Sequence, residues 1–148
     1  MSQKLPILVV DDDDAIRTMV ERVLRREQFE VEGARDGYEA IEKLTRNDYG
    51  TVLLDLMMPR VDGHGVLRFL EEHPKPARVI VMTANMQGGS EAAAARPVFR
   101  VLSKPFDISQ LIDHVRQCTS GDGGSERPSD APKQPRQSAS APVDVQPG

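Results

Sequence analysis

Residues 7–14 read Ile-Leu-Val-Val-Asp-Asp-Asp-Asp, an apolar run that ends in consecutive carboxylates. The run is too short for a signal peptide or a membrane span, and its length is typical of a buried strand. Further short apolar runs follow at Val31 with its neighbours, 52–54, 79–82 and 98–102. Together these runs predict five buried strands.

The segments between these runs carry apolar residues at helical spacing. The first helix has a polar face that includes Arg17 and Glu21, and Asp13 or Asp14 could cap its N-terminus. The apolar stripes are Ile16, Val20, Val23 and Leu24; Ala40, Ile41 and Leu44; Val66, Leu67 and Leu70; and Ile108, Leu111, Ile112 and Val115. A fourth helix is expected within residues 89–96. The alternation predicts a (βα)5 α/β fold, a five-stranded parallel sheet with helices on both faces.

The chain of 148 residues is long enough for one ordinary domain, and its composition changes after Thr119. Residues 120–148 are rich in Ser, Pro, Gly and Ala and contain no aromatic residue, so they can bury little surface. We therefore expect a folded domain at 1–119 and a disordered tail at 120–148. Because no DNA-binding or catalytic domain is recognised after residue 119, a stand-alone domain is expected.

Charge and cysteine content restrict the classes of function. A formal net charge of -4, without a long run of Lys or Arg, argues against direct binding of nucleic acid. The single cysteine, Cys118, cannot form an internal disulfide, which favours a reducing compartment. A cytoplasmic location without membrane association is the expectation.

Polar side chains stand where the predicted strands end. Asp11 and Asp12 follow the first strand, Asp55 ends the third, Thr83 ends the fourth and Lys104 follows the fifth. Because open parallel sheets bind ligands at the carboxyl ends of their strands, we expect these side chains to lie close together. Three converging carboxylates repel one another, and a divalent cation that prefers oxygen relieves the repulsion. Mg²⁺ fits best, since it accepts one or two carboxylates and keeps waters and phosphate oxygens as further ligands.

A carboxylate can also attack phosphorus and form an aspartyl phosphate. Asp55, alone at its strand end, is the candidate acceptor. Lys104 would neutralise one phosphoryl oxygen, and Thr83 would donate its hydroxyl to another. Lys104 precedes Pro105, and a tight turn there, with a cis or trans bond, would direct the lysine.

Four motifs, in this order, resemble the signatures of bacterial response regulator receiver domains, the phosphoacceptor modules of two-component systems. They are ILVVDDDDAIR at 7–17, VLLDLMMPRVDG at 52–63, VMTA at 81–84 and LSKPF at 102–106. The resemblance covers roughly residues 4 to 118. Each motif is weak by itself, but four in order, each at a predicted strand end, form a specific signal.

The resemblance implies a flavodoxin-like fold of the chemotaxis-regulator type, with strand order 2-1-3-4-5. It implies that a sensor histidine kinase or a phosphotransfer protein phosphorylates Asp55, and that an unidentified protein target reads the result. Mg²⁺ would be held by Asp12, Asp55 and the backbone carbonyl of Met57, with Asp11 assisting through water. Ala84 would leave space for the phosphoryl group. The chain would be a signalling domain and not a turnover enzyme.

The sequence departs from the family pattern near the fifth strand. Val101 stands three residues before Lys104, where the family usually has Tyr or Phe, and the spacing from Thr83 to Lys104 is about one residue short. These changes put in question the face around the fourth helix and fifth strand.

Three other functions remain open at this point. A pseudo-receiver would signal by binding alone. An aspartyl-phosphate phosphohydrolase is less consistent with the sequence, because such enzymes resemble an Asp-x-Asp pattern and Met57 occupies the second acidic position. A flavodoxin would need a hydroxyl-rich phosphate loop where this chain has the acidic residues 11–14.

Overall fold

Strand and helix alternate five times along the chain. The computed structural model describes residues 5–58, 61–84 and 86–119. Its elements are β1 (Ile7–Val10), α1 (Asp14–Arg26), β2 (Val31–Ala34), α2 (Gly37–Arg46), β3 (Thr51–Asp55), α3 (Gly63–Glu72), β4 (Arg78–Thr83), α4 (Met86–Ala92), β5 (Val98–Ser103) and α5 (Ile108–Thr119). The predicted (βα)5 fold is confirmed.

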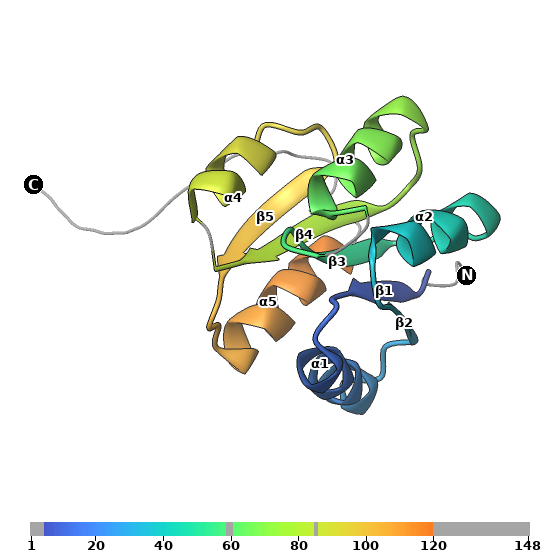
Figure 1. Ribbon diagram of the computed structural model, residues 1–148. Helices are drawn as coiled ribbons and strands as arrows, with labels where there is room; N and C mark the ends of the chain where they lie inside the picture. The colour runs from blue at the N-terminus through green and yellow to red at the C-terminus, as the bar shows by residue number, and fades with distance from the viewer. Residues whose placement is uncertain (1–4, 59–60, 85, 120–148) are drawn as a thin grey trace, which may run out of the picture.

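The five parallel strands form one sheet in the order β2-β1-β3-β4-β5, which confirms the expected topology. Helices α1 and α5 cover one face of the sheet, and α2, α3 and α4 cover the other (Figure 1). Because both faces are covered, the central strands are apolar on both sides instead of alternating with polar residues. All five residues of β3 are buried.

The register of the strands brings their carboxyl ends to one edge. Val10 of β1 pairs with Leu54 of β3, so Asp11 and Asp55 follow at the same level. Asp55 itself pairs with Met82, the residue before Thr83. These pairings set the polar residues of the first, third and fourth strands side by side.

The fourth helix differs from the sequence prediction. It spans Met86–Ala92, so it begins before residue 89 and ends before residue 96. After Ala92 the backbone tightens into turns in which the amides of Ala94 and Ala95 each bond a carbonyl three residues back. The residue before a proline disfavours helical backbone, and Pro97 follows this turn, which accounts for the early end of the helix.

An extra residue enters β5 near its start. Val79 pairs with Val98, whereas the next residue, Ile80, pairs with Arg100. This bulge places Phe99 and Arg100 on the same side of the strand, where the Arg100 guanidinium lies 4.8 Å from the centroid of the Phe99 ring and bonds Gln117 of α5. Beyond the bulge the register is regular as far as the pair of Thr83 and Ser103.

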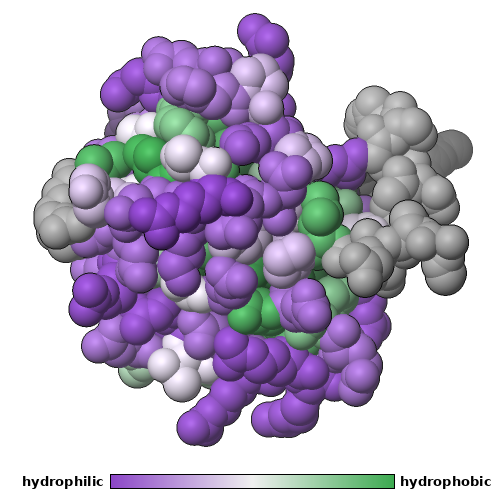
Figure 2. All heavy atoms as spheres, turned by 90° about the vertical axis from the view of Figure 1, so that its right-hand side faces the viewer, coloured by the Kyte–Doolittle hydropathy of each residue, from purple (hydrophilic) through white to green (hydrophobic). Residues whose placement is uncertain are grey.

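The visible side of the molecule in Figure 2, which lies at the right of Figure 1, is mostly hydrophilic, with hydrophobic side chains in small separate areas. Such scattered apolar area is normal for a globular domain. Within residues 5–58, 61–84 and 86–119, no helix is long and apolar enough to cross a membrane.

Candidate functional site

The acidic loop after β1 places its carboxylates at different depths. Asp11 is fully buried and its amide bonds the carbonyl of Ala34 in β2, whereas Asp12 is exposed. Oδ1 of Asp11 accepts a hydrogen bond of 2.9 Å from the amide of Asp13. Asp13 in turn caps α1 by accepting hydrogen bonds from the amides of Ala15 and Ile16. The loop therefore divides its acidic residues between the site and the start of α1.

Asp55 lies at the end of β3 with only 5% of its surface exposed. Its Oδ1 accepts a hydrogen bond of 3.2 Å from the amide of Met57. Burial raises the pKa of Asp55 to about 6, and the negative charge of Asp11 adds to this effect, while Lys104 opposes it. A carboxylate with this pKa is ionised at neutral pH and is a candidate nucleophile.

Hydrogen bonds hold described residues of the segment that follows Asp55. The amide of Gly63 bonds the carbonyl of Leu56 at 3.1 Å, and Asp62 caps α3 by accepting a hydrogen bond from the amide of Gly65. The amide of Gly37, at the start of α2, bonds the carbonyl of Val61 at 2.9 Å. The backbone beyond Asp55 is thus held by both α2 and α3.

Lys104 reaches the site from the end of β5. The bond to Pro105 is cis, and the amide of Lys104 bonds the carbonyl of Thr83 at 2.9 Å. Its ammonium lies 2.9 Å from Oδ2 of Asp11 and 3.6 Å from Oδ2 of Asp55. Burial opposes the charged form, but the hydrogen bond and the charge of Asp11, with help from Asp55, outweigh burial and raise the pKa of Lys104. The lysine is therefore a cation at neutral pH.

The three acidic side chains can share one cation. Asp11, Asp12 and Asp55 each offer a carboxylate oxygen, and these oxygens lie within 4.8 Å of one another. Among the described residues, Lys104 is the lysine whose ammonium pairs with this cluster. An all-oxygen set with excess negative charge fits Mg²⁺. The carbonyl of Met57 as a further ligand stays a prediction, although its amide bond to Asp55 holds this residue beside the cluster.

Thr83 is fully buried at the end of β4 and is followed by the exposed Ala84. Helix α4 passes close above it: a Cβ atom built on Gly89 would lie 3.0 Å from Cγ2 of Thr83 and 3.0 Å from Cγ1 of Val101. Gly89 thus allows the α4 backbone to rest on two branched side chains. Val101 is partly buried in the core beneath α4, the place where an aromatic residue was expected from the family pattern.

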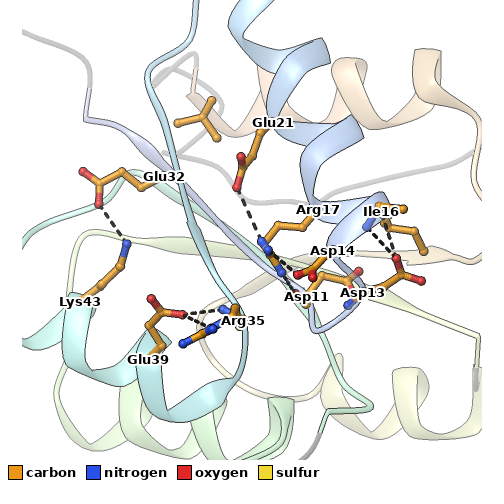
Figure 3. Close-up of polar contacts among 12 residues, drawn as sticks. Asp11, Asp13, Asp14, Ile16, Arg17, Glu21, Glu32, Arg35, Glu39 and Lys43 are labelled. Atoms are coloured by element: carbon orange, nitrogen blue, oxygen red, sulfur yellow. Dashed lines mark hydrogen bonds and ion pairs between the residues drawn. The ribbon is translucent and has the colours of Figure 1, made fainter.

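Arg17 was assigned by sequence only to the polar face of α1, but it folds back over the acidic loop. Its guanidinium donates to the carbonyl of Asp11 at 2.9 Å and to Oδ1 of Asp14 at 2.6 Å, as Figure 3 shows. The side chain is only 15% exposed. The i, i+4 spacing of Arg17, Glu21 and Arg25 is visible in the sequence, but the contact with the Asp11 carbonyl depends on the tertiary fold.

Residues 7–116 match the family model described as the response regulator receiver domain. The chain belongs to this family. Phosphorylation on an aspartate is general for response regulator receivers, which are signalling domains of two-component systems. The acidic cluster of this receiver is of the kind at which receiver domains typically bind Mg²⁺.

Sequence similarity to a curated protein also agrees with this family. The receiver is 38% identical over 115 residues to the transcriptional regulatory protein SrrA of Staphylococcus aureus, a match that covers 74% of this chain and 46% of SrrA. The chain therefore spans less than half the length of this relative.

Two solved structures are similar in fold. The Francisella response regulator 1452 receiver domain matches with a TM-score of 0.74 and 28% identity, covering 80% of this chain and 98% of the other. The Thermotoga maritima response regulator TrrA, in complex with Mg²⁺-BeF, matches with a TM-score of 0.71 and 30% identity, covering 77% and 98%.

Proposed function

We propose that Asp55 accepts a phosphoryl group from a histidine kinase or a phosphotransfer protein, and that the phosphorylated receiver signals by binding a downstream protein. The observation that carries the proposal is the arrangement at one sheet edge: the buried carboxylate of Asp55 lies 3.6 Å from the Lys104 ammonium and beside Asp11 and Asp12. SrrA, a transcriptional regulatory protein, is more than twice as long as its match here, so the proposal concerns the receiver alone.

In the proposed reaction, a carboxylate oxygen of Asp55 forms a bond to phosphorus while the bond from phosphorus to the donor breaks. The donor group, an imidazole nitrogen of a phosphohistidine or the carboxylate of acetyl phosphate, leaves with the electron pair. Lys104 is placed to neutralise a phosphoryl oxygen, because its ammonium already faces Asp55. Thr83, which ends the neighbouring strand, would donate its hydroxyl to a second oxygen.

Asp11, Asp12 and Asp55, with the Met57 carbonyl, would hold Mg²⁺. When bound, this ion supplies positive charge that offsets the charge of the phosphoryl oxygens. The structure of TrrA in complex with Mg²⁺-BeF supports the proposal by similarity, since beryllofluoride imitates a phosphoryl group.

Two alternatives are separated by direct tests. A pseudo-receiver would bind its partner without being phosphorylated, and the buried Asp55 with its lysine and acidic neighbours argues against it. A phosphohydrolase would need a general acid two residues after Asp55, where Met57 stands with an exposed side chain. Steady release of phosphate from a phosphoester would favour the hydrolase.

The deciding experiment is incubation with Mg²⁺ and acetyl phosphate, followed by intact-mass measurement. We expect one added phosphoryl group that is removed by hydroxylamine, as an acyl phosphate must be. Asp55→Asn and chelation of Mg²⁺ should each prevent the addition. Asp62→Asn is a matched control, because Asp62 caps α3 seven residues later and lies outside the acidic cluster. Phosphorylation of Asp55→Asn at the wild-type rate would contradict the proposal.

A further inference from the structure

Arg17 lies at the junction between α1 and the acidic loop. Its guanidinium donates to the backbone carbonyl of Asp11 and to the carboxylate of Asp14, and its Nε lies 3.9 Å from Oε2 of Glu21 (Figure 3). The side chains of Arg17 and Glu21 are 15% and 17% exposed. A planar guanidinium with acceptors on several sides has few alternative positions, because each of its donors fixes the same plane.

The side chains of Arg17 and Glu21 pack against Gly33 in β2. A Cβ atom on Gly33 would lie 2.0 Å from Oε2 of Glu21 and 3.2 Å from Cδ of Arg17. The absence of a side chain at position 33 therefore provides the space in which the Arg17–Glu21 pair lies against the sheet. Arg17 thus contacts Asp14 and Glu21 of α1 on one side and the backbone of β2 at Gly33 on the other.

We propose that Arg17 is a positioning residue for the acidic site: by holding the Asp11 carbonyl, it fixes the loop that presents the Asp11 and Asp12 carboxylates to Mg²⁺. This inference rests on the proposed function, because it assumes that the cluster binds the ion. The guanidinium of Arg17 bonds the ligand residue Asp11 at its backbone carbonyl, and it also bonds the carboxylate of Asp14, which is not a proposed ligand. Its effect is to select one loop conformation before the ion arrives.

A positioning role and a purely electrostatic role of Arg17 predict opposite effects of its removal on Mg²⁺ affinity. The guanidinium is a positive charge close to a cation site, so electrostatics alone predicts that its removal tightens Mg²⁺ binding. If Arg17 instead holds the loop, its removal weakens binding, because the carboxylates must be ordered when the ion binds. The direction of the change in affinity therefore distinguishes the two roles.

Arg25 provides a matched control on the same helix. It lies four residues after Glu21, as Arg17 lies four residues before it, and its Nη1 is 3.8 Å from Oε1 of Glu21. It also donates to a backbone carbonyl, that of Val31 at 3.0 Å. Arg25 thus makes the same kinds of contact as Arg17 but at the far end of β2, away from the acidic loop.

The test is the dissociation constant of Mg²⁺ alone, measured by calorimetry or NMR titration for wild type, Arg17→Gln, Arg17→Lys and Arg25→Gln. We expect Arg17→Gln to bind Mg²⁺ about tenfold more weakly, as for other residues that orient metal ligands. Arg17→Lys keeps the positive charge but lacks the planar guanidinium, so its affinity for Mg²⁺ should lie between those of Arg17→Gln and the wild type. Arg25→Gln should stay close to the wild-type affinity.

A second readout needs no metal. In EDTA, amide hydrogen exchange at residues 11–14 should be faster in Arg17→Gln than in wild type and unchanged in Arg25→Gln. Equal or tighter Mg²⁺ binding by Arg17→Gln, or weakening of the same size in Arg25→Gln, would overturn the positioning role. Failure of the wild-type protein to bind Mg²⁺ would instead count against the proposed function, so the two failures are distinct.

Discussion

The ammonium of Lys104 is hydrogen-bonded to Oδ2 of Asp11, a carboxylate with no solvent exposure, at 2.9 Å. The same ammonium is farther from Asp55, at 3.6 Å. The lysine therefore serves two purposes in one position: it compensates a buried charge at the end of β1 and faces the proposed phosphoacceptor at the end of β3.

Removing this ammonium should destabilise the protein. In EDTA, Lys104→Met should lower the free energy of unfolding by about 2–3 kcal/mol, because Asp11 is left buried without its cation. Added Mg²⁺ should recover part of the loss, because binding to the folded state supplies positive charge. Urea unfolding with EDTA and with Mg²⁺ measures both effects.

Lys43→Met is the control for this comparison. Lys43 lies 3.9 Å from Glu32, and the two side chains are 31% and 50% exposed, so its removal should cost less than about 1 kcal/mol. If Lys104→Met lost no more stability than Lys43→Met, Asp11 would not depend on this lysine.

The raised pKa of Asp55 predicts how stability changes with pH in EDTA. An unfolded aspartate ionises near pH 4, whereas the pKa of Asp55 is about 6 because of burial first and the charge of Asp11 second. The folded state thus holds this proton more tightly, so the contribution of Asp55 to stability is full below about pH 4 and is lost as pH rises through 6.

Asp55→Asn isolates this effect, since asparagine does not titrate. Its stability advantage over wild type should shrink by about 1 kcal/mol between pH 7 and pH 5, as wild-type Asp55 takes up its proton. Urea unfolding of both proteins across this range gives the comparison. A constant difference between them would show that Asp55 ionises with the pKa of an exposed carboxylate.

The contact of Gly89 with Thr83 and Val101 predicts where phosphorylation acts. Val101 has few side-chain conformations and lacks the reach of an aromatic ring, so little movement of β5 is expected. Amide exchange with Mg²⁺ and beryllofluoride should show added protection in the loops after Asp55 and Thr83 and at the start of α4. Protection of equal size across β5 would show that Val101 transmits the change after all.

Truncation after Thr119 tests the proposed domain boundary. Residues 120–148 lie outside the described residues, and their composition predicts that they bury little surface. The shortened protein should keep the melting temperature of the full chain and be phosphorylated by acetyl phosphate at the same rate. A clear fall in melting temperature would mean that the tail packs on the receiver.

Strands and strand-end residues were predictable because their signal is local. A short apolar run followed by Asp11, Asp55 or Thr83 needs no knowledge of the rest of the chain, and the parallel order then brings the ends together. The bounds of α4 were not predictable in this way, because Ala93, Ala94 and Ala95 favour helix, whereas the structure turns ahead of Pro97.

The contacts of Arg17 were hidden for a different reason. Spacing along α1 places it near Glu21, but its direction depends on the empty position at Gly33, which belongs to another strand. The distinction between the buried Asp11 and the exposed Asp12 also arises from tertiary structure, since both follow the same strand. The sequence pattern therefore identifies the acidic residues, but their burial and contacts depend on how the chain folds.

The bulge at the start of β5 separates an irregular part of the strand from a part that stays in register with β4. Its extra residue is absorbed around Phe99 and Arg100, while the pair of Thr83 and Ser103 stays in register and Lys104 remains anchored to the Thr83 carbonyl. Substitutions upstream of Val101 should therefore leave the position of the lysine unchanged. Tolerance to an inserted residue is therefore expected at the start of β5 and not at its end, where the pairing with β4 fixes the register.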